Sequence, residues 1–119
     1  MEIHQYVQDW ETYKRIIIVS DKGSVFIELS QHSLYDLCNH VKSEIWGLFV
    51  GESFRNKGIA KQLMKYAEDT IRQFGESYVA VVWNSSTPLW VLEWYEKSGY
   101  LFCKYLNDTD TLLVKRIKN

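Results

Sequence analysis

The stretch that decides the fold reads Leu48-Phe49-Val50-Gly51-Glu52-Ser53-Phe54-Arg55-Asn56-Lys57-Gly58-Ile59-Ala60. It leads from an extended apolar segment into a helix, and a helix start presents unpaired N–H groups and the positive end of the helix dipole. Gly58 has no Cβ, so an anion can approach the backbone closely there. Arg55 and Lys57 add positive charge at the rim. These features predict a phosphate-binding turn.

The better-known phosphate motifs do not occur in the chain. Neither G-x-x-x-x-G-K-[ST] nor G-x-G-x-x-G is found in the sequence. The turn therefore supports neither an NTPase loop nor a dinucleotide site.

The segments on either side of the turn form a recognisable unit. Residues 44–50 predict a strand, in which Gly47 indicates a bulge. Residues 58–74 carry apolar side chains on one helical face, and residues 78–83 are a continuous apolar run, typical of a strand covered on both sides. A strand, a helix and a second strand in this order predict a parallel, right-handed βαβ unit.

The rest of the chain predicts further strands and one more helix. Residues 33–43 stay open between a turn of helix and an irregular connection. The other expected elements are strands at 3–9, 14–20, 25–29, 100–106 and 111–117, and a helix at 88–98. The sequence thus predicts one α/β domain with a mixed sheet, spanning residues 1–119.

Composition and charge exclude several classes of protein. Apolar residues make up 46% of the 119 and charged residues 24%, as in ordinary globular proteins. No apolar run approaches the roughly 20 residues of a membrane span. Of the charged side chains in residues 47–75, five are basic and three acidic, a local excess of two within a chain of net charge −1. This short positive segment suits a small polyanion and does not predict a nucleic-acid partner.

The cysteines and histidines do not form a metal motif. Cys38 and Cys103 lie far apart, so a reduced, cytoplasmic chain is the simplest interpretation, and a pairing of the two stays open. Cys38 and His40, with His32 nearby, lack the two spaced ligand pairs of a zinc site. We therefore expect no metal.

Two motifs resemble those of the GNAT superfamily, the Gcn5-related N-acetyltransferases. Residues 55–60, RNKGIA, match the family signature [RQ]-x-x-G-x-[GA], and residues 94–100, WYEKSGY, are similar to F-Y-x-x-x-G-F. With the βαβ unit between them, the match covers residues 14–117. The resemblance implies a mostly antiparallel sheet whose two central parallel strands splay apart. It also implies acetyl transfer from acetyl-CoA to a primary amine of a small molecule or a protein.

The resemblance also implies which residues hold the cosubstrate. Backbone groups near Leu48, Phe49 and Val50 would pair with the pantetheine arm, and an amide near Val50 would polarise the thioester carbonyl. Many relatives carry an asparagine seven residues before the tyrosine of the second motif. Here that position is Pro88, and Asn84, four residues earlier, is the candidate for the contact. The pyrophosphate would be bound by the loop residues Arg55, Asn56, Lys57, Gly58, Ile59 and Ala60.

The resemblance also bears on the catalytic residues. Periodicity alone favours Tyr95 as a core aromatic, whereas the resemblance implies a general acid that protonates the departing CoA thiolate. An ammonium acceptor must lose a proton before it attacks, and Glu44, at the start of the 44–50 strand, is one candidate base. Glu28, His32, Asp108 or an ordered water are the alternatives.

The chain departs from the family near its N-terminus. Family members place two helices between their first two strands, where this sequence has little more than residues 10–13. The acceptor side is therefore expected to be open, completed by a second subunit, or suited to a protein surface. Trp10, Trp90 and Trp94 would form a homodimer contact or lie buried. The rival functions are a non-catalytic acyl-CoA-binding module with an incomplete acceptor pocket and a purely structural or interaction domain.

Overall fold

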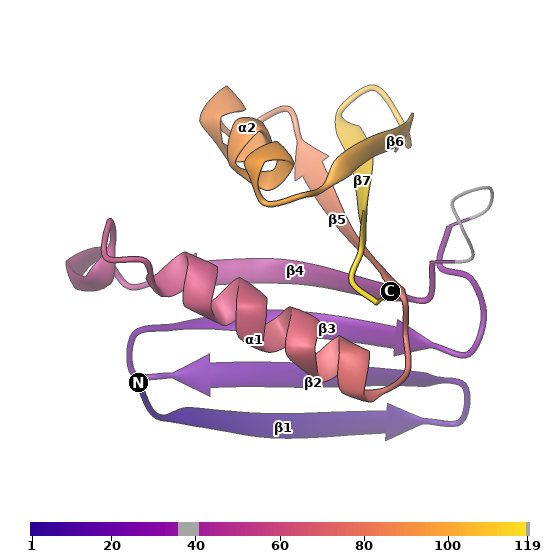
Figure 1. Ribbon diagram of the computed structural model, residues 1–119, viewed down its shortest axis with the longest axis horizontal. Helices are drawn as coiled ribbons and strands as arrows, with labels where there is room; N and C mark the ends of the chain where they lie inside the picture. The colour runs from indigo at the N-terminus through magenta and orange to yellow at the C-terminus, as the bar shows by residue number, and fades with distance from the viewer. Residues whose placement is uncertain (36–40, 119) are drawn as a thin grey trace.

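The computed structural model describes residues 1–35 and 41–118, and Figure 1 shows its ribbon. Within the segment 33–43, residues 33–35 and 41–42 are irregular and Ser43 begins a strand. The elements are β1 (Ile3–Trp10), β2 (Tyr13–Ser20), β3 (Gly23–Ser30), β4 (Ser43–Val50), the 3-10 turn η1 (Glu52–Phe54), α1 (Ile59–Gln73), β5 (Tyr78–Asn84), α2 (Leu89–Lys97), β6 (Leu101–Tyr105) and β7 (Asp110–Arg116).

Within these described residues the strands form one seven-stranded sheet. Its order is β1-β2-β3-β4-β5-β7-β6, with β4 and β5 parallel and every other neighbouring pair antiparallel. Parallel neighbours need a crossover, and α1 supplies it. The structure thus confirms the predicted α/β fold with a mixed, mostly antiparallel sheet around a parallel βαβ unit.

The main core lies between this sheet and α1, and a second, smaller buried cluster on β5 and β7 includes Ala80, Leu112 and Val114. Successive side chains of a strand point to opposite faces, so alternate residues such as Ile16 and Ile27 turn towards the helix. The predicted apolar stripe of α1 is buried through Ile71, but Phe74 is 49% exposed. The helix ends at Gln73, and Phe74 lies beyond it with the Lys14 ammonium 5.0 Å from its ring centre.

Helix α2 covers the same face of the sheet as α1. Leu92, Trp94 and Tyr95 pack against the core cluster that α1 lines. None of its residues is fully buried, and Leu89 and Trp90 at its start are 60% and 66% exposed. Helix α2 is therefore not surrounded by protein, although its sequence is nearly all apolar: its side chains are in contact with the core on one side only.

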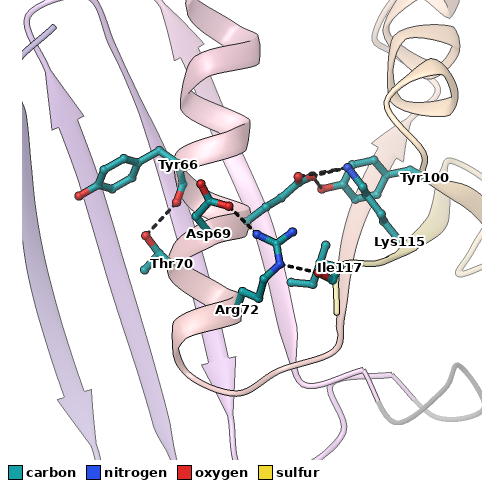
Figure 2. A network of polar contacts seen from close by, with 8 residues as sticks. Tyr66, Asp69, Thr70, Arg72, Tyr100, Lys115 and Ile117 are labelled. Carbon is teal, nitrogen blue, oxygen red and sulfur yellow. Dashed lines mark hydrogen bonds and ion pairs between the residues drawn. The ribbon is translucent and has the colours of Figure 1, made fainter. Parts of the chain in front are cut away.

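A buried polar network joins α1 to the C-terminal strands (Figure 2). The Tyr100 hydroxyl donates a 2.6 Å hydrogen bond to Glu68 Oε2, and Lys115 Nζ lies 3.1 Å from Glu68 Oε1. Tyr100 is fully buried, and the Glu68 side chain is 11% exposed. Arg72 adds a bond to the carbonyl oxygen of Ile117. The network fixes α1, on one side of the parting strands, to β7 on the other.

We expect Glu68→Ala to weaken the fold. It leaves the buried Tyr100 hydroxyl and the half-buried Lys115 ammonium without their acceptor, at a cost of about 2 kcal/mol in the free energy of unfolding. Asp69→Ala, one residue along the same helix and more exposed, is the matched control. Urea unfolding of both variants measures the difference, and equal losses would show that the network adds no stability.

Cys103 on β6 is disulfide-bonded, while Cys38 lies outside the described residues. The prediction of a reduced chain is therefore wrong at Cys103, because a disulfide depends on proximity in space, which separation along the sequence does not reveal. Among the helices described, none has the length and apolar character that crossing a bilayer demands.

Candidate active site

A bulge shapes the middle of β4. Ser24 pairs with Phe49 and Phe26 pairs with Trp46, so a three-residue step on β4 lies opposite a two-residue step on β3. Gly47 sits in this step with φ of 63°, and a Cβ there would lie 2.8 Å from the Phe26 ring. Both observations require glycine, and they confirm the bulge predicted at Gly47.

The parallel strands β4 and β5 meet at one end and then part. Their ladder consists of a single residue pair, Glu44 with Ala80, fastened by a 2.7 Å bond from Ser43 Oγ to the carbonyl oxygen of Tyr78. Figure 1 shows β5 turning away from β4 beyond this point. The splayed geometry is thus confirmed. Past the junction Leu48 and Val50 pack against the core, while Phe49 is 56% exposed.

The turn between β4 and α1 uses left-handed backbone at two residues. Asn56 has φ of 62° and Gly58 has φ of 78°. A Cβ built at Gly58 would meet no atom within 4 Å, so the space beside this glycine is open. Arg55 Nε donates a 3.2 Å bond to the carbonyl oxygen of Val50, which holds the turn against the end of β4.

The open turn leads directly into the first turn of α1. Gln62 N donates to Gly58 O at 3.1 Å, the first bond of the helix ladder. The amides that precede it, including those of Ile59 and Ala60, have no carbonyl of the helix to bind. Lys57 and Lys61 are exposed beside them. Backbone donors, added positive charge and unobstructed space together suit a bulky anion such as a pyrophosphate.

Tyr95 lies on α2 with its ring against the core. The Tyr100 ring meets it edge-on at 5.9 Å, and Tyr100 N donates to the carbonyl oxygen of Tyr95 at 3.1 Å. Burial raises the pKa of the Tyr95 phenol, so it keeps its proton at neutral pH. Within residues 1–35 and 41–118, no group hydrogen-bonds its hydroxyl. Such a phenol is suited to donate a proton, and its acid role stays a prediction.

Glu44 sits where β4 and β5 join. Burial raises its pKa above the ordinary 4.5, and the Tyr35 hydroxyl, which hydrogen-bonds Oε1, opposes this rise. Glu28 on β3 is directly opposite in register, so two of the four predicted base candidates are neighbours. His32 and Asp108 lie exposed in the turns after β3 and β6. The sequence did not predict that Tyr35 binds Glu44. Tyr35 lies in an irregular segment, where no periodic pattern of residues indicates which side chains meet.

A family model described as the acetyltransferase (GNAT) family matches residues 8–100. The chain belongs to this family. The match spans the bulged strand, the open turn and α2 with Tyr95, so the resemblance in the two motifs extends over most of the GNAT domain. No curated protein matches the chain in sequence.

Solved structures share the GNAT fold at low identity. A Klebsiella pneumoniae protein proposed to be an acyl-CoA N-acyltransferase is 15% identical, with a TM-score of 0.69 over 89% of this chain and 73% of its own. PaiA N-acetyltransferase from Thermoplasma acidophilum, in complex with coenzyme A, is 20% identical, with a TM-score of 0.62 over 88% and 61%. The NatC complex bound to Gag peptide and CoA includes a chain 23% identical, with a TM-score of 0.61 over 86% and 70%.

Asn84, the remaining cosubstrate candidate of this GNAT domain, ends β5. Its Nδ2 donates to Asp110 Oδ1 at 2.7 Å, and its Oδ1 accepts bonds from the amide and the hydroxyl of Ser86. One N–H of the side-chain amide remains for another partner. A contact from Asn84 to a pantetheine arm stays a prediction.

The three tryptophans expected at a subunit contact differ in their exposure. Trp10 on β1 is 52% exposed and Trp90 on α2 is 66% exposed, whereas Trp94 is half-buried against the core. Trp94 therefore contributes mainly to the core of the GNAT domain, and Trp10 and Trp90 remain the candidates for a subunit contact. Two residues of the alternative metal cluster, Cys38 and His40, lie outside the described residues.

Proposed function

We propose that this GNAT domain is an N-acetyltransferase that moves the acetyl group of acetyl-CoA directly to a primary amine of a small molecule or protein. The observation that carries the proposal is the open, left-handed turn at Gly58, set where β4 and β5 diverge. The helix start has amides without a helical acceptor, exposed lysines on either side and open space beside Gly58, an arrangement that suits an anion.

Acetyl-CoA supplies an activated thioester, and the chain's own residues guide the exchange. Glu44, six residues before Val50 on β4, accepts a proton from the acceptor ammonium through ordered water, which frees the nitrogen lone pair to form the new N–C bond. An amide near Val50 donates to the carbonyl oxygen as negative charge develops on it. The C–S bond then breaks, Tyr95 gives its proton to the departing sulfur, and the nitrogen loses its second proton, which restores the Tyr95 phenol. The products are an amide and the free thiol.

Cosubstrate binding and turnover are tested separately. Acetyl-CoA at about 100 times its Kd should raise the free energy of unfolding by about 2.7 kcal/mol, which a thermal shift detects. A thiol-release assay over a panel of small amines and peptides then measures turnover. Stabilisation without turnover on any acceptor would favour the acyl-CoA-binding module, for which the short β1–β2 turn is the supporting feature. No stabilisation would favour a structural domain.

We expect Tyr95→Phe to reduce kcat by about 100-fold while leaving the Kd for acetyl-CoA nearly unchanged. The substitution removes only the hydroxyl, and no group described here hydrogen-bonds it, so the fold should be unaffected. Tyr66→Phe on α1, where the hydroxyl accepts a bond from Gln5, is the matched control. Unaltered kcat in folded Tyr95→Phe would assign the proton to water instead.

The same domain is proposed to act without a metal and as a homodimer that uses its exposed tryptophans. Sedimentation of wild type and Trp90→Glu tests the last point, because a charge at a dimer contact would shift the equilibrium to monomer. A wild-type chain that sediments as a monomer at all concentrations would exclude this contact.

A further inference from the structure

The sheet has a face that neither described helix covers, and a row of large apolar side chains crosses it. Ile16, Ile27 and Ile45 point towards α1, so their neighbours along each strand point to the opposite, outer face. Figure 1 views the sheet from the side of α1, so the outer face is turned away from the viewer. Four of its residues, one from each of β1 to β4, lie opposite one another in register and form what we call the apolar row: Tyr6, Ile17, Phe26 and Trp46.

The apolar row and its surroundings are largely open to solvent. Tyr6 is 59% exposed and Trp46 is 38% exposed, while Ile17 and Phe26 between them are half-buried. Phe49, which lies in the next row on the same face, is 56% exposed. An exposed apolar surface that continues over four strands marks a contact with another molecule.

A row of polar side chains runs beside the apolar row and gives the outer face a direction. In register from β1 to β4, this charged row consists of Gln8, Arg15, Glu28 and Glu44. Arg15 on β2 is basic and forms an ion pair of 2.7 Å with Glu28 on β3. The sign of the charge therefore changes between β2 and β3. A partner that covers this face has to present apolar side chains to the apolar row and the opposite order of charges to the charged row.

A second copy of the chain presents the apolar row in the required order. A two-fold axis parallel to the strands, between β2 and β3, places β1 of each copy over β4 of the other and β2 over β3. The apolar row then meets itself in reverse, so that Tyr6 lies over Trp46 of the partner subunit and Ile17 lies over Phe26 of the partner subunit. Two sheets packed in this aligned way lie about 10 Å apart and interdigitate their side chains.

The charged row fits the same axis. Arg15 lies over Glu28 of the partner subunit, and Gln8 lies over Glu44 of the partner subunit, so each charge meets an opposite or a neutral side chain. A two-fold axis across the strands does not achieve this. It sets the charged row either over itself, with Arg15 against the partner's Arg15, or over a row of uncharged side chains, and both arrangements are unfavourable.

The outer face is large enough for a specific contact. Strands β1 to β4 have eight residues each. With a rise of about 3.3 Å per residue and a spacing of about 4.8 Å between strands, they cover roughly 500 Å² in each copy. The two copies together reach about 1,000 Å², which is the lower bound for a specific interface. The contact ends at β4, so it does not reach the gap where β4 and β5 part.

We propose that a second copy of this chain packs on the outer face, sheet on sheet, to form a two-fold dimer. The inference rests on the homodimer of the proposed function and assigns its contact to one side of the molecule. Trp10, whose ring packs with that of its register partner Tyr13, lies on the outer face within the contact. Trp90 lies outside it, because α2 covers the other face. The Gly58 turn at the start of α1 also lies outside it, so cosubstrate binding does not depend on the dimer.

Tyr6→Glu tests the contact, and Val7→Glu is its matched control. The two residues are adjacent on β1 and similarly exposed, at 59% and 53%, but only Tyr6 points to the outer face. Sedimentation equilibrium should show a wild-type dimer whose Kd rises at least about 100-fold in Tyr6→Glu, because the new carboxylate lies against Trp46 of the partner subunit. Val7→Glu and Trp90→Glu should match wild type. The thermal shift with acetyl-CoA should be the same for all four proteins.

A second pair of variants tests the direction of the axis, and it also serves if Tyr6→Glu does not fold. Gln8 is exposed on β1 and faces Glu44 of the partner subunit in the proposed dimer. Gln8→Lys should lower the Kd of the dimer and Gln8→Glu should raise it, so that the two values differ by about 10-fold at pH 8. Equal values would show that β1 does not lie over β4 and would overturn the proposed packing.

Three further outcomes overturn the outer-face contact. A wild-type chain that stays a monomer at all concentrations removes the homodimer as well. An unaltered Kd in folded Tyr6→Glu leaves the homodimer standing but places its contact elsewhere, and a raised Kd in Trp90→Glu would then place it at α2. An equal rise in Tyr6→Glu and Val7→Glu shows pairing along the free edge of β1 in place of packing on the face. These measurements do not depend on turnover, so acetyl transfer is decided separately by the thiol-release assay.

Discussion

Gly58→Val should abolish coenzyme A binding, with a loss in affinity of about 1,000-fold or more, equivalent to about 4.1 kcal/mol. The residue has φ of 78°, which a β-branched side chain resists, and the space beside it is free of other atoms. A valine would fill the space in which a pyrophosphate meets the amides of the first helical turn. Isothermal titration with coenzyme A measures the change.

Gly75→Val is a closely matched control for this experiment. Gly75 follows the other end of α1 with φ of 88°, and a Cβ there also meets nothing within 4 Å. The two variants should lose similar stability because the backbone strain is similar, but only Gly58→Val should lose affinity. Retained binding in Gly58→Val, or an equal loss in Gly75→Val, would contradict the placement of the pyrophosphate.

The unit around this glycine could be predicted because its signals are local. The apolar stripe of α1, the continuous apolar run of β5 and the glycine in β4 each lie within one element. That β4 and β5 diverge was predicted from the family resemblance and not from a local pattern. In the structure it takes the form of a ladder with a single residue pair, Glu44 with Ala80.

The candidate site could be predicted only in part, because its neighbours come from different strands. Glu28 and Glu44 were both predicted as base candidates, but that they face each other depends on the register of β3 against β4. The Tyr100–Glu68 bond joins residues 32 positions apart, and no periodic pattern reports such a pair. Arg55, predicted at the rim, also bonds back to Val50, a contact that depends on the shape of the turn.

Exposure was the least predictable property. The sequence of α2 indicates a helix with apolar side chains on nearly every side, yet Trp90 lies 66% exposed. Periodicity shows which side chains share a face, but it does not show how much protein lies opposite each face. Helix α2 packs on one side only, and β6 is the edge strand beside β7.

Glu44→Gln should lower kcat/KM for amine acceptors by about 1,000-fold and change the pH profile. Wild-type activity should rise with pH as the Glu44 carboxylate loses its proton, with a midpoint above the ordinary value of 4.5 because burial raises this pKa. In Glu44→Gln that limb should disappear, since the amide has no proton to lose. Rates from pH 4 to pH 9 for wild type and variant make the comparison.

Stability should move in the opposite direction to activity. A carboxyl group whose pKa is raised by folding binds more protons in the native than in the unfolded chain between 4.5 and the folded value, so its contribution to stability falls as pH rises through that window. Glu44→Gln removes this penalty and keeps an oxygen for the Tyr35 hydroxyl. It should therefore unfold at the same or a higher temperature than wild type at pH 7.

Glu76→Gln controls for the loss of a carboxylate elsewhere. Glu76 is half-buried in the connection between α1 and β5, outside the proposed site, and its substitution should leave the pH profile unaltered. Loss of activity together with loss of folding in Glu44→Gln would make the carboxylate structural. If folded Glu44→Gln keeps both the wild-type rate and the rise of activity with pH, Glu44 is not the base. Ordered water or one of the exposed candidates, His32 or Asp108, would then be the base.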